Sequence, residues 1–283
     1  MSLLTIAIPT FHNSQMLHWC MGSMKRDAWF DYEIILVDNG SRDNEENYLS
    51  DEHGRPYDGR VRVLRPGRNL GWMGAINLAL EHTRTPLFCM LNDDVVFLPG
   101  RPGFWNAMAS WLDHDIVGAV GPCSNFAAGS QSLMAALDGG VHMNDHIQTS
   151  MLIGFCLMMR TKDLKSVGGL DADLPGGDDL DLSIRLRESG LALVVDRTLY
   201  LHHHGQSTGK RVYGEDWDSS ASQEKINNAL IKKHGVRKWY ECYSCGWRPM
   251  SAKGPSLPDR FMVPLAIDDG APEECYVDSG HEV

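Results

Sequence analysis

Two apolar segments separated by a helical one open the chain, and this order constrains the fold more than any other feature. Leu3–Thr10 reads as an apolar strand that ends just after a proline, and Tyr32–Val37 reads as a second buried strand. Between them, Asn13 and Ser14 form a potential cap for a helix that continues to about Met24. A strand, a helix and a second strand form a βαβ unit. The sequence therefore predicts an α/β fold built on a mostly parallel sheet.

The strand expected at Leu87–Leu91 leads directly into an acidic turn, Asn92, Asp93 and Asp94. Ligands of open parallel α/β sheets bind at the carboxyl ends of the strands. Hard cations such as Mg²⁺ and Mn²⁺ prefer oxygen ligands and combine one or two carboxylates with substrate phosphates. We interpret the turn as such a site, while a functionless acidic turn has the same composition. Asp38, at the end of the second strand, projects from the same edge, either as a turn residue or as an acceptor for a nucleotide's base or ribose.

A glycine-rich loop follows the short strand expected at Val61–Arg65. Gly67, Gly71 and Gly74 permit a ligand to approach the backbone closely, and Arg68 can donate to a phosphate. Glycine loops before helices are common, so this segment alone fits either a phosphate site or an ordinary helix start.

The helix expected at Asp178–Gly190 begins with three carboxylates. Asp178 and Asp181 have the spacing of a capping pair and suit the positive end of the helix dipole. This explanation leaves Asp179 without a structural role. We therefore predict that Asp179 is the chemically active carboxylate of the three.

Three consecutive histidines, His202, His203 and His204, follow a further expected strand. Imidazole is a common metal ligand and could complete the site begun by Asp94, while exposed histidines without a role are the alternative. A polar stretch after them carries Lys210, and we interpret it as a lid over an anionic ligand.

Length and composition limit the organisation of the chain. With 283 residues, 43% of them hydrophobic, it can bury one large core with an appendage. We expect one main domain at 1–205, a lid and helical extension at 206–248, and a linker with an acidic tail at 249–283. The irregular stretch at 121–146 is where we expect acceptor contacts.

Charge and cysteine usage exclude several classes of protein. The 26 basic and 37 acidic residues give a net charge of -11, which disfavours a sequence-independent grip on nucleic acid. The seven cysteines are scattered and do not resemble a disulfide framework, so we expect a reducing, cytoplasmic setting. No apolar stretch reaches the length that a membrane span requires. The sequence does not indicate an oligomeric state.

Taken together, motifs spread from Leu3 to Gly205 resemble the family 2 glycosyltransferases, including rhamnosyltransferase-like members. Their order and spacing are more specific than any single motif. The matching segments are Ile8–Thr10, Val37–Ser41, Asn69–Asn77, Leu91–Asp94, Gly177–Leu182 and the three histidines. The resemblance implies the α/β GT-A fold, a Rossmann-like, mostly parallel central sheet flanked by helices, here with a C-terminal extension.

The resemblance also implies roles for the acidic residues. The acidic turn resembles the family's DxD motif, which binds a divalent metal and the donor diphosphate, and Asp94 matches its usual metal ligand. Asn92 departs from that motif at its first position. Asp179 matches the general base that deprotonates the acceptor hydroxyl, and Asp178, which replaces the family's glutamate, is expected to raise the pKa of Asp179.

The remaining site residues follow from the same resemblance. Alternate residues of a strand share one side, so we expect His202 or His204 to face the metal and His203 to point away. The donor-binding residues that the resemblance implies are Pro9, Thr10, Asp38, Arg68, Asn69, Gly71, Asn77, Asn92, Asp93 and Lys210.

These features predict a metal-dependent inverting glycosyltransferase, a hexosyl- or deoxyhexosyltransferase that uses Mn²⁺ or Mg²⁺ and a UDP- or dTDP-linked sugar. One base and no covalent nucleophile imply a single displacement. The acceptor is a glycan, a lipid-linked sugar or another hydroxyl compound, and the net charge disfavours DNA. A sugar-phosphate nucleotidyltransferase is an alternative, but Pro9–Asn13 lacks its basic glycine-rich loop. A non-catalytic binding protein is the other, and the presence of Asp94, Asp179 and the histidines argues against it.

Overall fold

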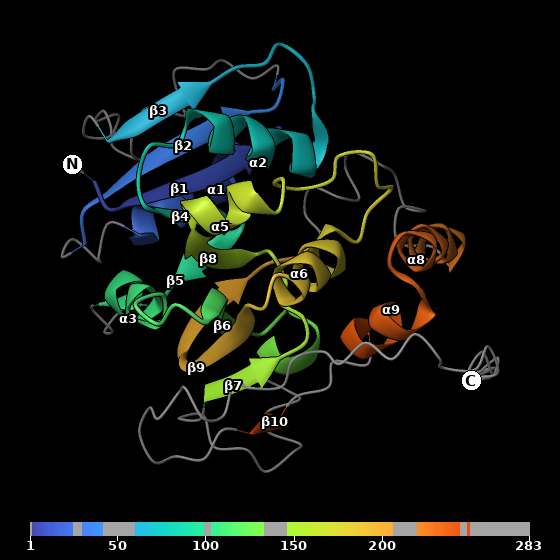
Figure 1. Cartoon of the computed structure of the whole chain (residues 1–283). Helices are drawn as coiled ribbons and strands as arrows, with labels where there is room; N and C mark the ends of the chain where they lie inside the picture. The colour runs from blue at the N-terminus through green and yellow to red at the C-terminus, as the bar shows by residue number, and fades with distance from the viewer. Residues whose placement is uncertain are drawn as a thin grey trace.

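A ten-stranded sheet with helices on both faces forms the body of the protein (Figure 1). The structure, a computed structural model, describes residues 2–24, 30–41, 60–98, 103–132, 146–205, 220–243 and 248–249. The strands are β1 (Leu4–Thr10), β2 (Tyr32–Asp38), β3 (Val61–Leu64), β4 (Leu87–Leu91), β5 (Val95–Phe97), β6 (Val117–Ser124), β7 (His146–Thr149), β8 (Cys156–Arg160), β9 (Ala192–His203) and β10 (Arg248–Pro249). The helices are α1 (Ser14–Met24), α2 (Gly71–His82), α3 (Phe104–Trp111), the 3₁₀-helix η2 (Gly129–Gln131), α5 (Thr161–Ser166), α6 (Asp178–Glu188), α8 (Ser220–His234) and α9 (Val236–Tyr243).

The sheet is mixed rather than mostly parallel. Its strand order is β10-β7-β9-β6-β8-β4-β1-β2-β3, and β5 pairs with β9 outside this path. The predicted parallel pairing is present among β3, β2, β1 and β4 and between β6 and β9. β8, however, runs antiparallel to both of its neighbours, β4 and β6. The α/β class is confirmed, and the antiparallel strand returns the chain to the edge where β4 ends.

The start of β8 determines where the chain meets the acidic turn. The sequence predicts a strand over Met151–Met159, but β8 begins only at Cys156, which pairs with Leu91 at the end of β4. The residues just before β8 are therefore irregular and lie beside the turn that follows β4. In addition, His146–Thr149 forms β7, a strand that the sequence does not predict and whose first residue ends the stretch expected to be irregular. Residues 133–145 lie outside the described residues.

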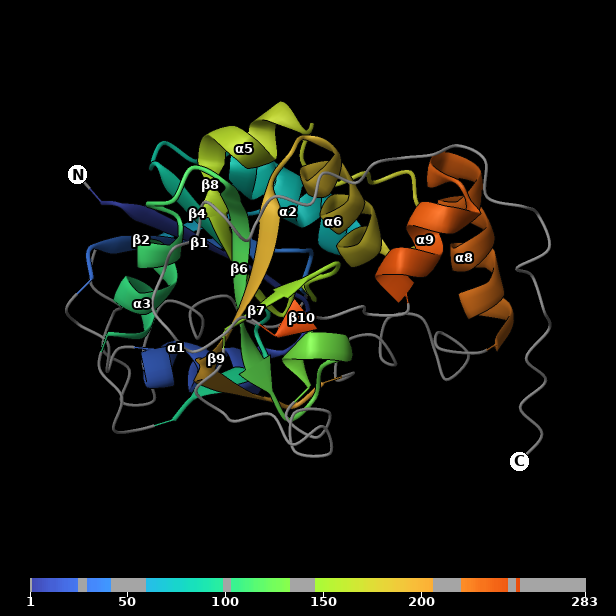
Figure 2. The same cartoon turned by 60° about the horizontal axis from the view of Figure 1, so that its bottom comes forward.

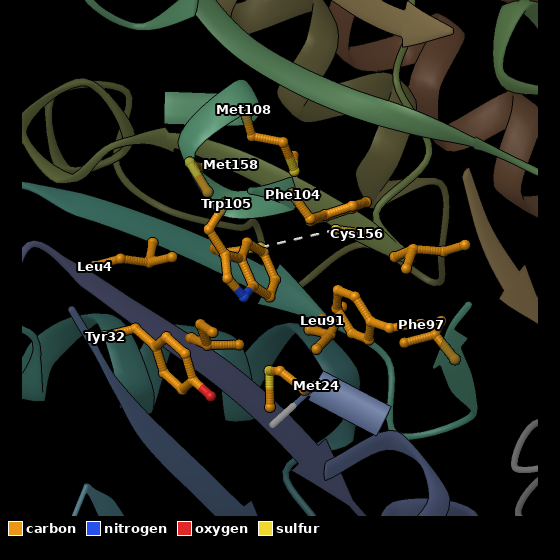
Figure 3. Packing of buried hydrophobic residues seen from close by; sticks show 14 of the residues in the cluster. Leu4, Met24, Tyr32, Leu91, Phe97, Phe104, Trp105, Met108, Cys156 and Met158 are labelled. Carbon is orange, nitrogen blue, oxygen red and sulfur yellow. Dashed lines mark hydrogen bonds between the residues drawn. The ribbon is translucent and has the colours of Figure 1, made fainter. Parts of the chain in front are cut away.

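Two apolar layers hold the helices to the sheet. On one face, side chains of α1 and α3 pack against the strands around Trp105, whose ring contacts those of Phe97 and Phe104 (Figure 3). On the other face, apolar side chains of α2, α5 and α6 form the second layer. Burying such side chains contributes about 1.5 to 3 kcal/mol each. The two apolar layers hold the helices in place, so that the N-termini of α1, α2 and α6 lie around the carboxyl edge of the parallel strands.

The C-terminal helices α8 and α9 lie beside α6, away from the sheet (Figures 1 and 2). The sequence predicts α8 but not α9. Cys242 of α9 is buried in a small apolar cluster with Met151 and Ile184 of α6. These helices fall within the segment 206–248, and the domain boundaries themselves stay a prediction. Among the described residues, no helix has both the length and the apolar character required to cross a membrane.

Candidate active site

The acidic turn after β4 is anchored to the end of β1. Both carboxylate oxygens of Asp93 accept hydrogen bonds, one from the Thr10 hydroxyl at 2.8 Å and one from the Asn13 amide at 3.0 Å. Burial and the neighbouring Asp94 charge raise the pKa of Asp93 to about 7, although these two hydrogen bonds oppose the shift. Asp93 and Thr10 thus fix the turn, and their expected contacts with a donor stay predictions.

His203, rather than His202 or His204, faces the acidic turn. Its Nε2 lies 3.1 Å from Oδ1 of Asp94 and 3.1 Å from the Asn92 amide nitrogen. The expectation that His203 points away is wrong. The reason is the pairing of the short strand β5 with β9, which sets Val95 opposite His203.

His202 and His204 occupy the other side of the strand. Their rings contact each other with centroids 4.8 Å apart, and the His204 ring lies 6.0 Å from that of Trp19 on α1. The alternation along the strand is as expected, but its phase is reversed. The backbone N–H of His204 donates to the carbonyl of Asp94 at 3.0 Å, but the two rings lie on the side of the strand away from the Asp94 carboxylate. This arrangement does not support their predicted role as metal ligands.

The tautomer of His203 suits it to hold a cation. Its Nδ1 lies 2.8 Å from the carbonyl oxygen of Phe126 and must donate to it, because a carbonyl only accepts. In the neutral ring, Nε2 then presents a lone pair toward Asp94, and metal-bound histidines are held in this way. Among the described residues, no group of three or more His, Cys, Asp and Glu side chains is arranged to hold a metal ion. One carboxylate and one imidazole nevertheless fit a cation whose other ligands are phosphate oxygens and water.

A two-residue segment before β8 links this turn to α6. The backbone N–H of Gly154 donates to Oδ1 of Asp179 at 2.8 Å, and the carbonyl of Phe155 accepts from the N–H of Asn92 at 2.9 Å. The Phe155 ring also stacks on His203, with centroids 5.2 Å apart and planes inclined by 20°. A Cβ on Gly154 would lie 2.8 Å from Oδ1 of Asp179, so only glycine leaves this contact undisturbed. These two adjacent residues therefore connect Asp179 to the acidic turn and to His203, and the predicted roles of these side chains stay predictions.

The two carboxylates at the start of α6 have raised proton affinities. Burial and the negative charge of Asp178 raise the pKa of Asp179 well above its ordinary value, and the bond from Gly154 opposes this only in part. Burial raises the pKa of Asp178 to about 6, although a hydrogen bond from the Trp72 side chain lowers it. A carboxylate with such an environment is suited to accept a proton near neutral pH.

Replacing Asp178 with asparagine is expected to shift the pH dependence of activity. With Asp179 as the general base that the sequence predicts, the rate should rise with pH as its carboxyl loses a proton, because only the ionised form can accept one. Asp178→Asn removes a negative charge that raises the pKa of Asp179, so the acidic limb should move to lower pH. The measurement is the rate of nucleoside diphosphate release across pH 5 to 9. An unmoved limb would contradict the electrostatic coupling of the pair.

Asp181 has a role different from the capping function that the spacing indicates. The residue before α6 is Gly177, in the left-handed conformation with φ 74°, and no side chain caps the helix. Asp181 instead accepts two hydrogen bonds from Arg185, at 2.9 and 2.6 Å, and one from His234 at 2.7 Å. Burial alone would raise the pKa of Asp181, but hydrogen bonds from His234, Lys233 and Arg185 hold it below its ordinary value.

The glycine-rich loop is attached to the turn after β2. The Asn39 side chain accepts from the N–H of Leu70 at 2.8 Å and donates to the carbonyl of Gly71 at 3.1 Å. Asp38 accepts from the N–H of Ser41 at 2.9 Å and lies 3.7 Å from Arg65. These bonds place the end of β2 and the start of α2 at the same edge as the acidic turn. Asn39 was not among the predicted site residues, although its position in a turn after a strand could have indicated it.

The other predicted donor-binding residues are spread around this edge. Arg68 and Asn69 are exposed on the loop before α2, and Asn69 accepts from the N–H of Gly71 at 2.8 Å. Pro9 lies in β1 opposite Val37 and beyond the residues that pair with β4. Their expected contacts with a donor stay predictions.

Asn77 contacts the protein rather than an open edge. Its amide nitrogen donates to the carbonyl of Leu170 at 2.7 Å and its oxygen accepts from the Leu170 N–H at 2.8 Å. The nitrogen and the oxygen of the Asn77 side-chain amide thus both attach α2 to the segment that leads to α6. Lys210 lies outside the described residues. Trp72 and Gly154 were missed as contributors, since each acts through a neighbour that only the folded chain provides.

Comparisons with known proteins identify the family of the chain. The family model described as Glycosyl transferase family 2 matches residues 5–168, more than half of the chain. An uncharacterized protein of Mycobacterium tuberculosis (strain ATCC 25618 / H37Rv) is 28% identical over 250 residues, which cover 82% of this chain and 85% of the relative. The pre-mycofactocin glycosyltransferase of the same strain is 26% identical over 211 residues, covering 71% of this chain and 42% of the relative.

Solved structures share the fold at low sequence identity. The mannosyltransferase PcManGT of Pyrobaculum calidifontis, in complex with GDP-Man and Mn²⁺, aligns with a TM-score of 0.61 and 14% identity, over 84% of this chain and 67% of that one. TarS of S. aureus, residues 1–349, aligns with a TM-score of 0.59 and 13% identity, over 86% of this chain and 71% of that one. Together with the family match, the central sheet and the acidic edge identify the chain as a member of glycosyl transferase family 2, and hence as a glycosyltransferase with the GT-A fold.

Proposed function

We propose that the protein is a metal-dependent, inverting glycosyltransferase that moves a sugar from a nucleoside diphosphate to an acceptor hydroxyl. The observation that carries this proposal is the Gly154–Phe155 segment, which joins Asp179 to the Asn92 turn and His203. The proposed base is thus contacted by Gly154, and the turn and the histidine that would bind the cation are contacted by the next residue, Phe155. Transfer requires both functions at one site.

In this proposal Asp179 accepts the proton of the acceptor hydroxyl while the oxygen attacks the anomeric carbon. The new glycosidic bond forms as the bond to the diphosphate breaks, and the diphosphate leaves with the electron pair. A single displacement inverts the anomeric configuration. Asp94 and His203 would hold a Mn²⁺ or Mg²⁺ ion, which supplies charge neutralisation for the leaving diphosphate.

The environment of Asp179 supports its assignment as the base. Efficient general bases have a pKa near the working pH. An ordinary aspartate is too weak a base at neutral pH, whereas burial and Asp178 raise the pKa of Asp179. Asp179 is not fully buried, as a base that receives an acceptor from solution requires.

We base the donor class on the turn that follows β2, at the carboxyl edge of the sheet. Asp38 and the turn after β2 suit the base or ribose of a nucleotide, and we propose a UDP- or dTDP-linked hexose or deoxyhexose. PcManGT is described with GDP-Man and Mn²⁺, so a GDP-linked sugar belongs in the same test. For the acceptor we propose a glycan, a lipid-linked sugar or another hydroxyl compound.

A donor panel tests the proposal directly. We expect one of UDP-glucose, dTDP-rhamnose and GDP-mannose, with MnCl₂, to raise the melting temperature of the full chain, since a ligand that binds only the folded state stabilises it. At a concentration of about 100 times Kd the gain is about 2.7 kcal/mol. The stabilising donor should also release its nucleoside diphosphate on incubation with the enzyme and Mn²⁺. A panel without any shift or release would contradict the proposed function.

A further inference from the structure

The last turn of α8 contacts residues on both sides of the bend at Gly176 and Gly177 that leads into α6. We call this bend the elbow. The Lys233 ammonium lies 2.6 Å from Oδ2 of Asp171, in the loop before the elbow, and 2.5 Å from Oδ1 of Asp181, in the helix after it. His234 adds a contact of 2.7 Å to the same oxygen of Asp181. Asp181 has no solvent exposure, so Lys233 compensates a fully buried charge and His234 adds a hydrogen bond to it.

Apolar side chains of α8 cover the elbow itself. A Cβ on Gly176 would lie 2.8 Å from Ile226, and a Cβ on Gly177 would lie 2.7 Å from Leu230. Both glycines have positive φ, 153° and 74°, so larger residues are excluded by conformation and by space. The elbow that presents Asp178 and Asp179 is therefore packed directly under α8.

The second helix of the pair holds the other element that contacts Asp179. The Ser150 hydroxyl donates to the carbonyl of Glu241 at 2.7 Å, and the Cys242 thiol donates to the carbonyl of Ser150 at 3.2 Å. Ser150 begins the irregular segment that precedes β8. This segment contains Gly154, whose N–H donates to Asp179. Helices α8 and α9 thus fix both structural elements that position this carboxylate.

We propose that the last turn of α8, together with the contacts of Glu241 and Cys242 to Ser150, positions the acceptor-activating carboxylate, and that Lys233 is a positioning residue for Asp179. The inference rests on the proposed role of Asp179 as the base. Lys233 touches neither substrate nor the reacting atoms. It acts through Asp171 and Asp181, whose separation sets the direction in which the elbow presents Asp179.

The charges around Asp181 give Lys233 a second effect on the base. Arg185 of α6 and Lys233 and His234 of α8 face the Asp181 carboxylate. The negative charge of Asp181 raises the pKa of Asp178, its neighbour at the start of the helix. Removing the Lys233 charge leaves more of the Asp181 field acting on Asp178, which in turn is coupled to Asp179.

The test compares Lys233→Met, Lys233→Arg and the matched control Lys238→Met in the full chain. Lys238 forms an equivalent ion pair, 2.7 Å from Glu188 at the far end of α6, away from the elbow. With water as the acceptor, and the panel donor that stabilises the enzyme, we expect Lys233→Met to lower kcat by about tenfold to a hundredfold, as a small misplacement of a catalytic group does. The donor KM should stay within about twofold, because the metal and nucleotide contacts are unchanged.

Two further readouts separate positioning from a general loss of structure. The acidic limb of the pH–rate profile should shift in Lys233→Met and should be restored in Lys233→Arg, whereas Lys238→Met should match the unmodified enzyme. Independently of any substrate, amide hydrogen exchange in residues 176–183 should be faster in Lys233→Met only. Exchange, kcat and pH profile that are the same in Lys233→Met and Lys238→Met would overturn the proposal.

The Asp179→Asn variant distinguishes the two proposals. If Asp179→Asn retains activity, the proposed base is wrong, and the exchange result still shows whether Lys233 holds the elbow. If Asp179→Asn is inactive while Lys233→Met retains full kcat and an unshifted profile, only the positioning role fails.

Discussion

Replacing Asp179 with asparagine is expected to abolish sugar transfer while leaving donor binding intact. Asparagine keeps the shape and the acceptor oxygen that receives the Gly154 N–H at 2.8 Å, but it cannot take a proton. General bases contribute about 10²- to 10⁴-fold to rates, which corresponds to about 3 to 5 kcal/mol of the barrier. The measurement pairs nucleoside diphosphate release with the melting-temperature shift produced by the stabilising donor.

The control for this variant is Asp173→Asn, an exposed carboxylate on the loop before α6. Its rate and donor-induced shift should both match those of the unmodified enzyme. Near-normal turnover by Asp179→Asn, with the control unchanged, would reject Asp179 as the base. If Asp179→Asn lost both the donor-induced shift in melting temperature and turnover, the residue would be needed for folding or donor binding rather than for activating the acceptor.

Replacing His203 with alanine is expected to weaken the response to Mn²⁺ more than any other histidine substitution. His203 is the imidazole that lies 3.1 Å from Asp94, and its Nδ1 is held by the Phe126 carbonyl. Loss of even the groups that support a metal ligand costs about 10- to 100-fold in affinity or activity, so we expect at least about a tenfold rise in the Mn²⁺ concentration for half-maximal activity. The measurement is a Mn²⁺ titration of nucleoside diphosphate release after chelator treatment.

His202→Ala is the matched control, because its ring lies on the opposite side of the same strand and contacts His204. Its Mn²⁺ response should not change. If His202→Ala or His204→Ala weakened the response while His203→Ala did not, the phase predicted from the sequence would be correct after all. Full activity of the unmodified protein without any divalent cation would remove both Asp94 and His203 from the proposed roles.

The local elements could be predicted from sequence because each carries its own periodicity and boundary signals. The strands that end at Thr10 and Asp38, and the helix after Gly71, occur where their apolar patterns and turn residues place them. The direction of β8 could not be predicted in the same way. An apolar run such as Cys156–Met159 has no directional signal, and its antiparallel pairing depends on contacts with β4 and β6.

The residue types of the candidate site could be predicted from the sequence. The side of the strand that each residue faces, and its contacts with distant residues, could not. The three histidines and the carboxylates at the start of α6 stand out by composition. The choice of His203 depends on the short strand β5, whose three residues carry too little pattern to be recognised alone. Asp181 has the spacing of a capping residue, yet its partners Lys233 and His234 are more than 50 positions away along the chain.

The Gly154–Phe155 segment has a consequence for how the enzyme tolerates change. The distance between the two chemical halves of the reaction is set by strand register, since Leu91 pairs with Cys156 directly after this segment. Connecting loops elsewhere can vary in length without altering that distance. A one-residue insertion that shifted β8 by one position would turn its side chains to the opposite face of the sheet, so that the proposed base and the proposed nucleotide site could no longer be reached by the same substrate pair.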